Sequence, residues 1–497
     1  MLALPQEAKL LEQFRPAFTC PTYRRFLVLC VGAIIAMGRR SVSRILWAVG
    51  PLIQGDPSSY HRFFCQARWS LWPLARILAG RVLARVPANR PVMVAVDDSV
   101  DRHSGKKVFA KGCYRDPVRS SHSRTVLTFG HKWVVMAILV KLPFCKRPWA
   151  LPVLAALYQP PTKNQTAPKA ARPRAGKSPK TRKSKAGKKA RKPCSKPWSK
   201  IKEGRALRHV KDGPRHKTPP LLARQMIATL IHWFPDRHFV LLGDWGFGCH
   251  DLALFCYRHR KHVTLIARMR GDTSLYALPP AKKRPGRGRR ALKGRRLPSP
   301  AQQVAATLQR VCSKVAWYGN RKRELHLLSG CGGWYRGRGG GRAALVPIRW
   351  VFVHDPQSGR DDWFFSTDPT LRPQRIVESF AGRWAIEVTF QEMRAHLGLG
   401  STRQWCRQSV LRTVPCLLGL FTVVSLIWAE LAKAGKPPVH RTPCYAKAHP
   451  TFADALYGVR RLLWEQVILP QCDPQGHVTQ LPQALRQILL EHLATAA

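Results

Sequence analysis

Acidic residues are scarce in this chain. The 26 Asp and Glu stand against 85 Lys and Arg among 497 residues, which gives a formal net charge of +59. A chain with this charge repels itself, so we expect a polyanionic partner that offsets the repulsion. Nucleic acid is the first expectation, because each neutralised phosphate releases condensed counterions. The alternatives are an acidic membrane surface, or a source in which proteins are basic throughout.

The sequence also lacks paired cysteines, a signal peptide and a clear membrane span. Its 14 Cys contain no C-x-x-C pair, which favours a reduced intracellular protein over a zinc or disulfide scaffold. No basic start followed by an apolar run opens the chain, so we expect a cytoplasmic, nucleoid-associated protein. The apolar stretch 414–432 approaches spanning length, but Pro415 and Glu430 favour a buried helix, and we expect no membrane contact.

What remains is the composition of a folded protein with several domains. Hydrophobic residues make up 45% of the chain and aromatic residues 9%, which excludes wholesale disorder. Residues 1–90 have helical patterns with interleaved Arg, His and aromatics, typical either of a DNA-binding domain or of a helical bundle with a solvated basic face. Beyond them, apolar runs rich in Val and Ile alternate with helical patterns, which predicts an α/β fold.

Two basic segments interrupt the α/β pattern. Sixteen Lys or Arg and no acid lie between Pro160 and Lys202, which predicts a disordered basic insert over 160–215 that either contacts phosphates or is a plain linker. A second run, Lys282–Arg296, precedes strand-like pieces around the glycine run Gly339–Gly341. The patterns predict five regions: an N-terminal helical, DNA-binding domain (1–90), a first core part (91–270), a β-rich insertion (271–365), a second core part (366–433) and a C-terminal helical region (434–497).

Two apolar strand patterns run directly into carboxylates, Val92–Asp98 and His238–Asp244. A carboxylate at the end of a buried strand is partly desolvated, and it is stable there when it accepts hydrogen bonds or binds a cation. If the two strands are neighbours in a parallel sheet, their acids come within reach of one divalent ion, and oxygen ligands suit Mg²⁺ or Mn²⁺. The alternative is that both acids cap the turns that follow.

A third acid lies in the pattern Phe380-x2-Arg383-x3-Glu387-x6-Arg394, on a helix predicted to begin near Pro373. At about 100° per residue, Arg383, Glu387 and Arg394 share one face, so the acid lies between two cations. The pattern fits an ordinary i,i+4 ion pair worth a few tenths of a kcal/mol. It equally fits a metal-binding carboxylate flanked by cations for phosphates.

Together these motifs resemble the insertion-sequence DDE transposases with a ribonuclease-H-like core, in which a Tyr-x2-Arg-x3-Glu-x6-Lys signature carries the third acid. The spacing is kept here, with Phe380 in place of the Tyr and Arg394 in place of the Lys. Val96-Asp97-Asp98-Ser99 resembles the first motif, an Asp followed by Thr or Ser, which favours Asp98 over Asp97 without excluding Asp97. Gly243-Asp244-Trp245-Gly246-Phe247-Gly248 resembles the second motif.

The resemblance implies a ribonuclease-H-like mixed sheet flanked by helices, with Asp98, Asp244 and Glu387 as catalytic residues that hold two Mg²⁺ or Mn²⁺ ions. It implies DNA cleavage at transposon ends followed by strand transfer, without a covalent protein intermediate. The implied partners are double-stranded DNA, as terminal inverted repeats and as target, and a second copy of the chain on that DNA. The residues expected to contact DNA are Phe380, Arg383, Arg394, Trp245 and Arg268.

Several alternatives stay open. The chain could be a nucleic-acid-binding protein without catalysis, or a two-metal nuclease that joins no ends. Trp245 and Trp405 could be stacking platforms for extruded bases, or packed core residues. His131, ahead of a predicted strand at 134–142, is open in the same way, although a lone histidine in such a place is more often structural.

Overall fold

The computed structural model describes residues 4–495 except for gaps at 117–118, 122, 144, 162–215, 280–290, 308, 338–343, 434, 436–446, 448 and 474. Residues 1–158 and 219–497 form one compact unit, which contains every element named below. The predicted basic insert lies almost entirely outside the described residues. So do the glycine run Gly339–Gly341 and most of the second basic run.

The first part of the chain is helical. Its elements are η1 (Gln6–Ala17), α1 (Cys20–Ile35), α2 (Val42–Val49), η2 (Gly50–Leu52), α3 (Ser58–Cys65) and α4 (Leu71–Leu83). The Ser70 side chain accepts a hydrogen bond from the Trp72 amide at the start of α4, and Ser41 accepts one from the Arg44 amide at the start of α2. These serines satisfy amides that have no partner within the helix.

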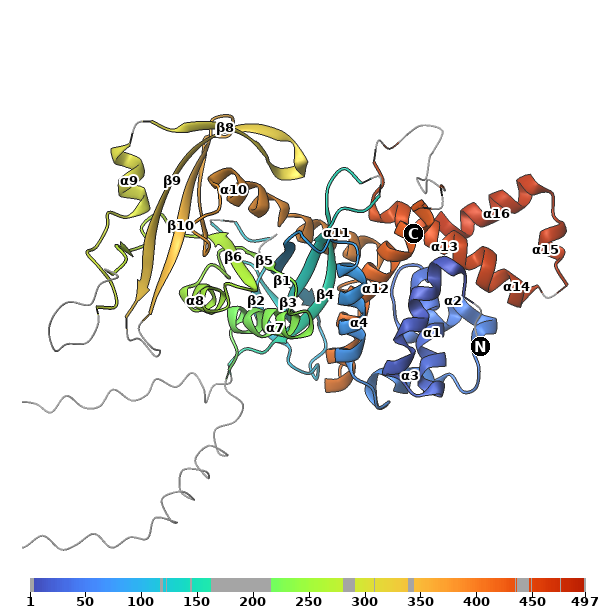
Figure 1. Ribbon diagram of the computed structural model, residues 1–497. Coiled ribbons are helices and arrows are strands. Elements are labelled where there is room, and N and C mark those ends of the chain that lie inside the picture. Colours follow the sequence, from blue (N-terminus) through green and yellow to red (C-terminus); the bar gives the residue numbers. More distant parts are fainter. Residues whose placement is uncertain are drawn as a thin grey trace, which may run out of the picture. The chain divides into compact units, whose positions relative to one another are not determined.

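Five strands give the core a ribonuclease-H-like topology (Figure 1). They lie in the order β4-β3-β1-β5-β6; β3 is antiparallel to both its neighbours, whereas β1, β5 and β6 run parallel. The strands are β1 (Val92–Arg102), β3 (Leu127–Val140), β4 (Trp149–Tyr158), β5 (Phe239–Gly243) and β6 (Val263–Arg268), and a short β2 (Gly112–Arg115) pairs with the start of β3. The predicted mixed α/β sheet is confirmed.

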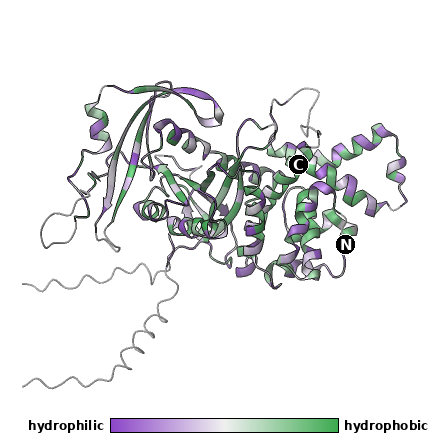
Figure 2. Cartoon of the chain, viewed as in Figure 1, coloured by the Kyte–Doolittle hydropathy of each residue, from purple (hydrophilic) through white to green (hydrophobic). Residues whose placement is uncertain are grey.

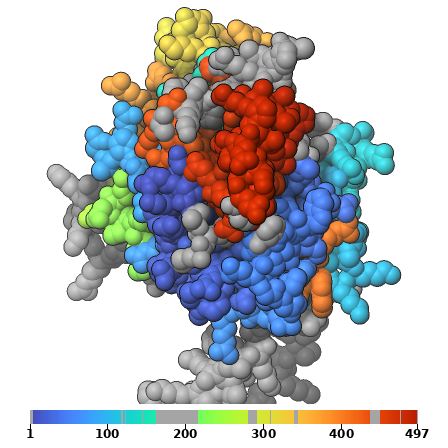
Figure 3. Space-filling view, turned by 90° about the vertical axis from the view of Figure 1, so that its right-hand side faces the viewer, coloured from blue at the N-terminus to red at the C-terminus, as the bar shows by residue number. Residues whose placement is uncertain are grey.

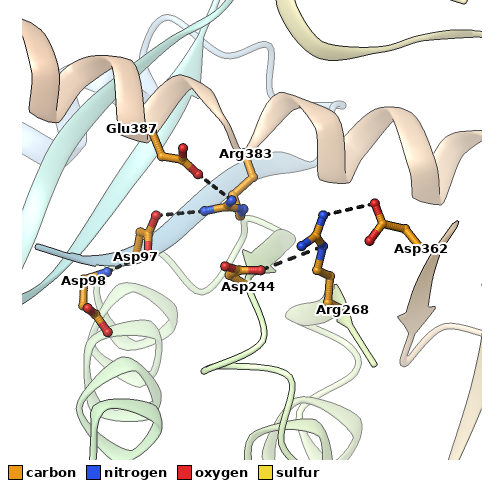
Figure 4. A network of polar contacts seen from close by, with 7 residues as sticks. All are labelled: Asp97, Asp98, Asp244, Arg268, Asp362, Arg383 and Glu387. Atoms are coloured by element: carbon orange, nitrogen blue, oxygen red, sulfur yellow. Dashed lines mark hydrogen bonds and ion pairs between the residues drawn. The ribbon is translucent and has the colours of Figure 1, made fainter. Parts of the chain in front are cut away.

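Helices cover both faces of this sheet, which explains the apolar strand runs. Figure 4 shows the strands between the helix that carries Glu387 and the helices of the opposite face. Those helices are α7 (Pro219–Trp233), between β4 and β5, and α8 (His250–Arg258), between β5 and β6. Strands buried on both faces lose polar alternation and become continuous Val, Ile and Leu runs. Figure 2 accordingly shows the central strands as largely hydrophobic.

The β-rich region after β6 joins the core sheet. β11 pairs antiparallel with β6, and β10, β9 and β7 continue the same sheet outward, giving 11 strands within the described residues. The elements are β7 (Leu275–Tyr276), α9 (Pro300–Ala306), β8 (Val311–Ala316), η3 (Tyr318–Asn320), β9 (Lys322–Arg336), β10 (Ala344–Asp355) and β11 (Arg360–Ser366). This pairing brings β11 next to the site described below.

The helical pattern predicted from Pro373 forms two helices, α10 (Pro373–Gly382) and α11 (Ala385–His396), followed by α12 (Arg407–Lys433). By length and composition α12 could cross a membrane, but 72% of its apolar window is buried inside the protein. Polar side chains within it donate to buried carbonyls: Ser425 to that of Phe421 one turn earlier, and Thr422 to that of Pro152 on β4. These are properties of a core helix.

The C-terminal elements are α13 (Phe452–Leu463), η4 (Trp464–Ile468), α14 (Leu469–Cys472), α15 (His477–Gln480) and α16 (Gln483–Thr495). Figure 3 shows C-terminal residues, in red, against N-terminal residues, in blue. α13 contacts α1 and α12, so segments more than 400 residues apart in the sequence pack together.

Candidate active site

Arg383 lies between two carboxylates that come from different elements (Figure 4). Its Nη1 is 2.8 Å from Asp97 Oδ2 on β1, and its Nη2 is 2.7 Å from Glu387 Oε1 on α11. The guanidinium is buried, so its contact with the less exposed Asp97 is only weakly screened by water, whereas the Glu387 side chain is 42% exposed. The predicted i,i+4 pair between Arg383 and Glu387 is present, and it also holds α11 to the sheet through Asp97.

Asp98, the residue favoured from the sequence, points away from this cluster (Figure 4). Its Oδ2 is 2.9 Å from the Lys132 Nζ of β3. Successive side chains of a strand point to opposite faces, so Asp97 and Asp98 cannot both face α11. The structure therefore corrects the geometric expectation: Asp97 joins Glu387, and Asp98 does not.

Asp244 follows β5 directly, and a tight turn orients it. The amides of Phe247 and Gly248 both donate to the Asp244 carbonyl, at 2.9 Å each, before α8 begins. A Cβ atom on Gly248 would lie 2.1 Å from the Arg268 carbonyl at the end of β6, so no larger residue fits there without displacing the backbone. This close approach accounts for the last glycine of the Gly-Asp-Trp-Gly-Phe-Gly motif.

Arg268, like Arg383, lies between two carboxylates from different elements. Its Nη2 is 3.1 Å from Asp362 Oδ2 on β11, and its Nε is 4.0 Å from Asp244 Oδ1. The sequence did not indicate Asp362, because the pairing of β11 with β6 that brings it here has no local signature. The predicted position of Arg268 at the end of a strand is correct.

The buried ring of Phe380 packs against the guanidinium groups of both arginines. Its ring is 1% exposed and lies 5.5 Å from the Arg268 guanidinium carbon and 5.4 Å from that of Arg383. It also packs on Phe364 of β11 at a centroid distance of 4.4 Å. The prediction that Phe380 contacts DNA does not fit this burial; the ring instead stabilises the two cations by cation–π contact.

Burial shapes the protonation equilibria of the site. It raises the pKa of Asp97 from 3.8 to about 6, although the Arg383 guanidinium acts in the opposite direction. Burial likewise raises the pKa of Asp362, against the effect of Arg268. Burial also lowers the pKa of Arg383, but the carboxylates of Asp97, Asp244 and Glu387 outweigh it and leave that pKa above its ordinary value. Arg383 is thus a permanent cation facing three acids.

The remaining residues that the sequence suggests for contact with DNA or extruded bases are Arg394, Trp245 and Trp405. Arg394 Nη2 donates to Ser99 Oγ at 2.5 Å, two residues beyond Asp97 on the same face of β1. Trp245 is 48% exposed and Trp405 is 65% exposed, so neither is a packed core residue. Trp405 borders an open cleft of about 740 Å³ whose lining also includes Arg39, Arg102, Arg403 and Phe129.

The donor set fits hard divalent cations. Carboxylate oxygens are the preferred ligands of Mg²⁺ and Mn²⁺. Asp244 Oδ1 is buried and has no hydrogen-bond partner among the described residues. The Arg383 guanidinium shows that a positive charge is stable between Asp97 and Glu387. A metal ion there would compete with Arg383 for the same oxygens.

The structure thus places a group of carboxylates and arginines at one edge of a ribonuclease-H-like sheet. Residues 13–324 match the family described as DDE superfamily endonuclease, and the chain belongs to that family. The match contains Asp97 and Asp244 but ends before α10 and α11, so the place of Glu387 rests on geometry.

Similarity to other known proteins is weak. The chain is distantly similar to a piggyBac transposase in a synaptic complex with hairpin DNA, at 10% identity and a TM-score of 0.38, over 98% of this chain and 80% of that chain. A likeness this weak carries no argument. No curated protein matches the chain.

Proposed function

We propose that this chain is a DNA transposase that cleaves phosphodiesters at transposon ends and transfers the freed strands to a target. Membership of the DDE superfamily endonucleases supports the cleavage chemistry. The observation that carries the proposal is the convergence of Asp97 and Glu387 on one buried guanidinium, with Asp244 close enough to raise the pKa of the same group.

In this proposal Asp97, Asp244 and Glu387 are the catalytic acids and would hold two divalent ions, Mg²⁺ or Mn²⁺. When bound, such ions supply activation of a water or 3′-hydroxyl and stabilisation of the leaving oxygen. Arg383 would exchange carboxylate oxygens for phosphate oxygens as the acids take up cations. Arg268 and Arg394 would hold the DNA backbone on either side, because bidentate guanidinium contacts to phosphate give position rather than sequence preference.

The DNA partner is proposed from charge and exposed aromatics. A net charge of +59 favours phosphate binding that weakens steeply with salt. The cleft beside Trp405 combines three arginines with exposed rings, a combination that binds single strands or extruded bases. Terminal inverted repeats and target DNA are the proposed substrates, and handling two ends at once favours a homodimer on DNA.

Variants of the acids test the proposal. We expect Asp97→Asn and Glu387→Gln to lower Mg²⁺-dependent cleavage and strand transfer by at least about 10³-fold, because each removes a metal-binding oxygen and the loss falls on the transition state. Asp98→Asn is the matched control: it changes the adjacent carboxylate on the opposite face of β1, and we expect less than a tenfold effect. The assay uses the full chain with the ends of its own element and plasmid target DNA, and filter binding measures DNA affinity in parallel.

The outcomes separate the alternatives. Cleavage without joined products would indicate a nuclease that does not transfer strands. DNA binding without any Mg²⁺- or Mn²⁺-dependent cleavage would indicate a binding protein. If Asp98→Asn abolishes cleavage while Asp97→Asn retains it, the acid assigned here is wrong and the sequence-based preference for Asp98 is right.

A further inference from the structure

We propose that Asp101, His103 and His131 form a separate binding site for one transition-metal dication of the Zn²⁺ type, where the end of β1 meets the first part of β3. The site shares no residue with the Asp97, Asp244 and Glu387 cluster. Metal binding there would not require the proposed transposase activity.

The three side chains are buried together. Asp101 is 3% exposed, His103 8% and His131 1%. One ligand atom from each lies within 4.8 Å of the others, and the two imidazole centroids are 4.4 Å apart. Asp101 and His131 are direct cross-strand partners in the β1–β3 ladder, so the sheet register itself brings them together. Charged or polar groups this deeply buried need partners.

A hydrogen bond settles which nitrogen of His131 can bind a cation. His131 Nε2 lies 2.7 Å from the Phe109 carbonyl, which accepts only, so Nε2 carries the proton. Burial lowers the pKa of His131, which favours the neutral ring. Nδ1 then carries a lone pair, yet it is buried and has no partner among the described residues. A ring with one N–H on a backbone carbonyl and the other nitrogen free is the usual arrangement of a metal-binding histidine.

Asp101 presents a second acceptor without a donor. Its Oδ1 is buried and unpartnered within the described part of the chain. Its Oδ2 has two long contacts, 3.3 Å to His103 Nε2 and 3.4 Å to Thr402 Oγ1. Two buried acceptors in one cluster are unfavourable unless something positive or proton-donating lies between them. A dication satisfies both, because it accepts lone pairs from carboxylate and imidazole alike.

One carboxylate and two imidazoles are the donor set of open zinc sites and of related Co²⁺, Ni²⁺ and Fe²⁺ sites. His103 also lines the cleft beside Trp405, which leaves a route for a water as the fourth ligand. The site would tie three segments together: the end of β1, the loop that supplies the Phe109 carbonyl, and the loop of Thr402. The Phe109 amide also donates to the Trp405 carbonyl, so a bound metal would hold the rim of that cleft.

Two substitutions test the site without removing its buried shape. His131→Gln can still donate to the Phe109 carbonyl but has no lone pair at the Nδ1 position. Asp101→Asn keeps the size of the side chain and places an amide donor near His131 Nδ1. We expect the full chain to bind one Zn²⁺ or Co²⁺ that Mg²⁺ does not displace, and Co²⁺ to show visible absorption of four-coordinate strength. Each variant should weaken Co²⁺ binding by more than about 100-fold, beyond the usual effect of changing an outer contact.

Controls separate this site from the proposed active site. Asp97→Asn with Glu387→Gln should keep the Co²⁺ absorption in full, even where cleavage is lost. His250→Gln alters another buried histidine that contacts a backbone carbonyl, that of Trp334, and should leave Co²⁺ binding unchanged.

The melting temperature of the wild-type chain provides a second test, which does not depend on whether a variant folds. If a metal occupies the site, chelation of the wild-type chain lowers its melting temperature and Zn²⁺ restores it. If the site instead holds water, chelation has no effect, and Asp101→Asn raises the melting temperature because its amide satisfies His131 Nδ1. That second pattern, or Co²⁺ binding that survives both substitutions, overturns the proposal.

Discussion

At the scale of single residues, the site combines strong attraction with an unfavourable burial of charge. Asp97 has its pKa raised to about 6, because burial penalises its charged form more than Arg383 stabilises it. The native state therefore binds a proton at Asp97 more tightly than the unfolded chain does. The free energy of unfolding consequently falls as the pH rises from 3.8 to about 6, and the full cost is present above that range. Sites that bind substrates or ions commonly carry such a cost.

This cost can be measured with a neutral isostere. We expect Asp97→Asn, with EDTA present, to raise the free energy of unfolding at pH 8 by about 1 to 3 kcal/mol, since one pKa unit corresponds to about 1.4 kcal/mol. The gain should shrink as the pH falls below about 6, the pKa of Asp97. Urea unfolding at several pH values provides the test. Asp98→Asn, on the more open face, should change the free energy of unfolding by less than about 0.5 kcal/mol. If Asp98→Asn stabilised the protein as much as Asp97→Asn, the burial cost would not be specific to Asp97.

At the scale of elements, the break between α10 and α11 positions Arg383. The Arg383 amide donates to the Phe380 carbonyl and the Trp384 amide to the Ala381 carbonyl, three residues back rather than four. This tight turn interrupts the helix without leaving the helical region of backbone angles. The guanidinium can then reach Asp97 and Glu387 at once, whereas the sequence pattern predicted one uninterrupted helix.

Two glycines that border α10 and α11 should respond oppositely to alanine. Among the described residues a Cβ on Gly382 would meet only Leu139, at 3.7 Å, so Gly382→Ala should stabilise the fold by about 0.5 to 1 kcal/mol through lower chain entropy. Gly398, after α11, has φ +68°, and a Cβ there would lie 2.8 Å from Ser401 Oγ. Gly398→Ala should destabilise by about 1 to 3 kcal/mol. The denaturant midpoints of the two variants test both expectations. A higher midpoint for Gly398→Ala than for the wild-type chain would contradict the backbone geometry.

At the scale of the whole molecule, buried arginines connect distant parts of the chain at helix ends. Arg460 of α13 donates from Nε to the Ile34 carbonyl at 2.8 Å and from Nη2 to the Ala36 carbonyl at 3.2 Å, at the end of α1. Arg40 donates to Ala33 there and, at 2.6 Å, to the His396 carbonyl at the end of α11. Cations are favoured at these carbonyls. Burial lowers the pKa of both arginines to about 10.

Removing one of these arginines should loosen the contact between the two ends of the chain. We expect Arg460→Ala to lower the free energy of unfolding by about 3 to 5 kcal/mol, because it leaves a cavity and buried carbonyls without donors. Arg461→Ala is the control: its guanidinium has a 3.5 Å contact to the Tyr457 hydroxyl, and a loss below about 1 kcal/mol is expected. Thermal unfolding measures both, and equal losses would show that burial at position 460 is not decisive.

The sequence by itself determined the features that depend on local patterns. Apolar runs predicted the buried strands, alternation with helical patterns predicted the mixed sheet, and the spacing of Arg383 and Glu387 predicted their ion pair, because contacts four residues apart on a helix need no other element. The position of Asp244 directly after a strand was likewise readable from the chain.

Tertiary structure alone decided the rest. Strand alternation places Asp97 and Asp98 on opposite faces, but which face receives α11 depends on packing between segments nearly 300 residues apart. The same holds for Phe380, which is buried because β11 joins β6, and for His131, which meets Asp101 through the β1–β3 register. Such contacts follow from how whole elements bury their apolar surfaces together, and no short stretch of sequence records that outcome.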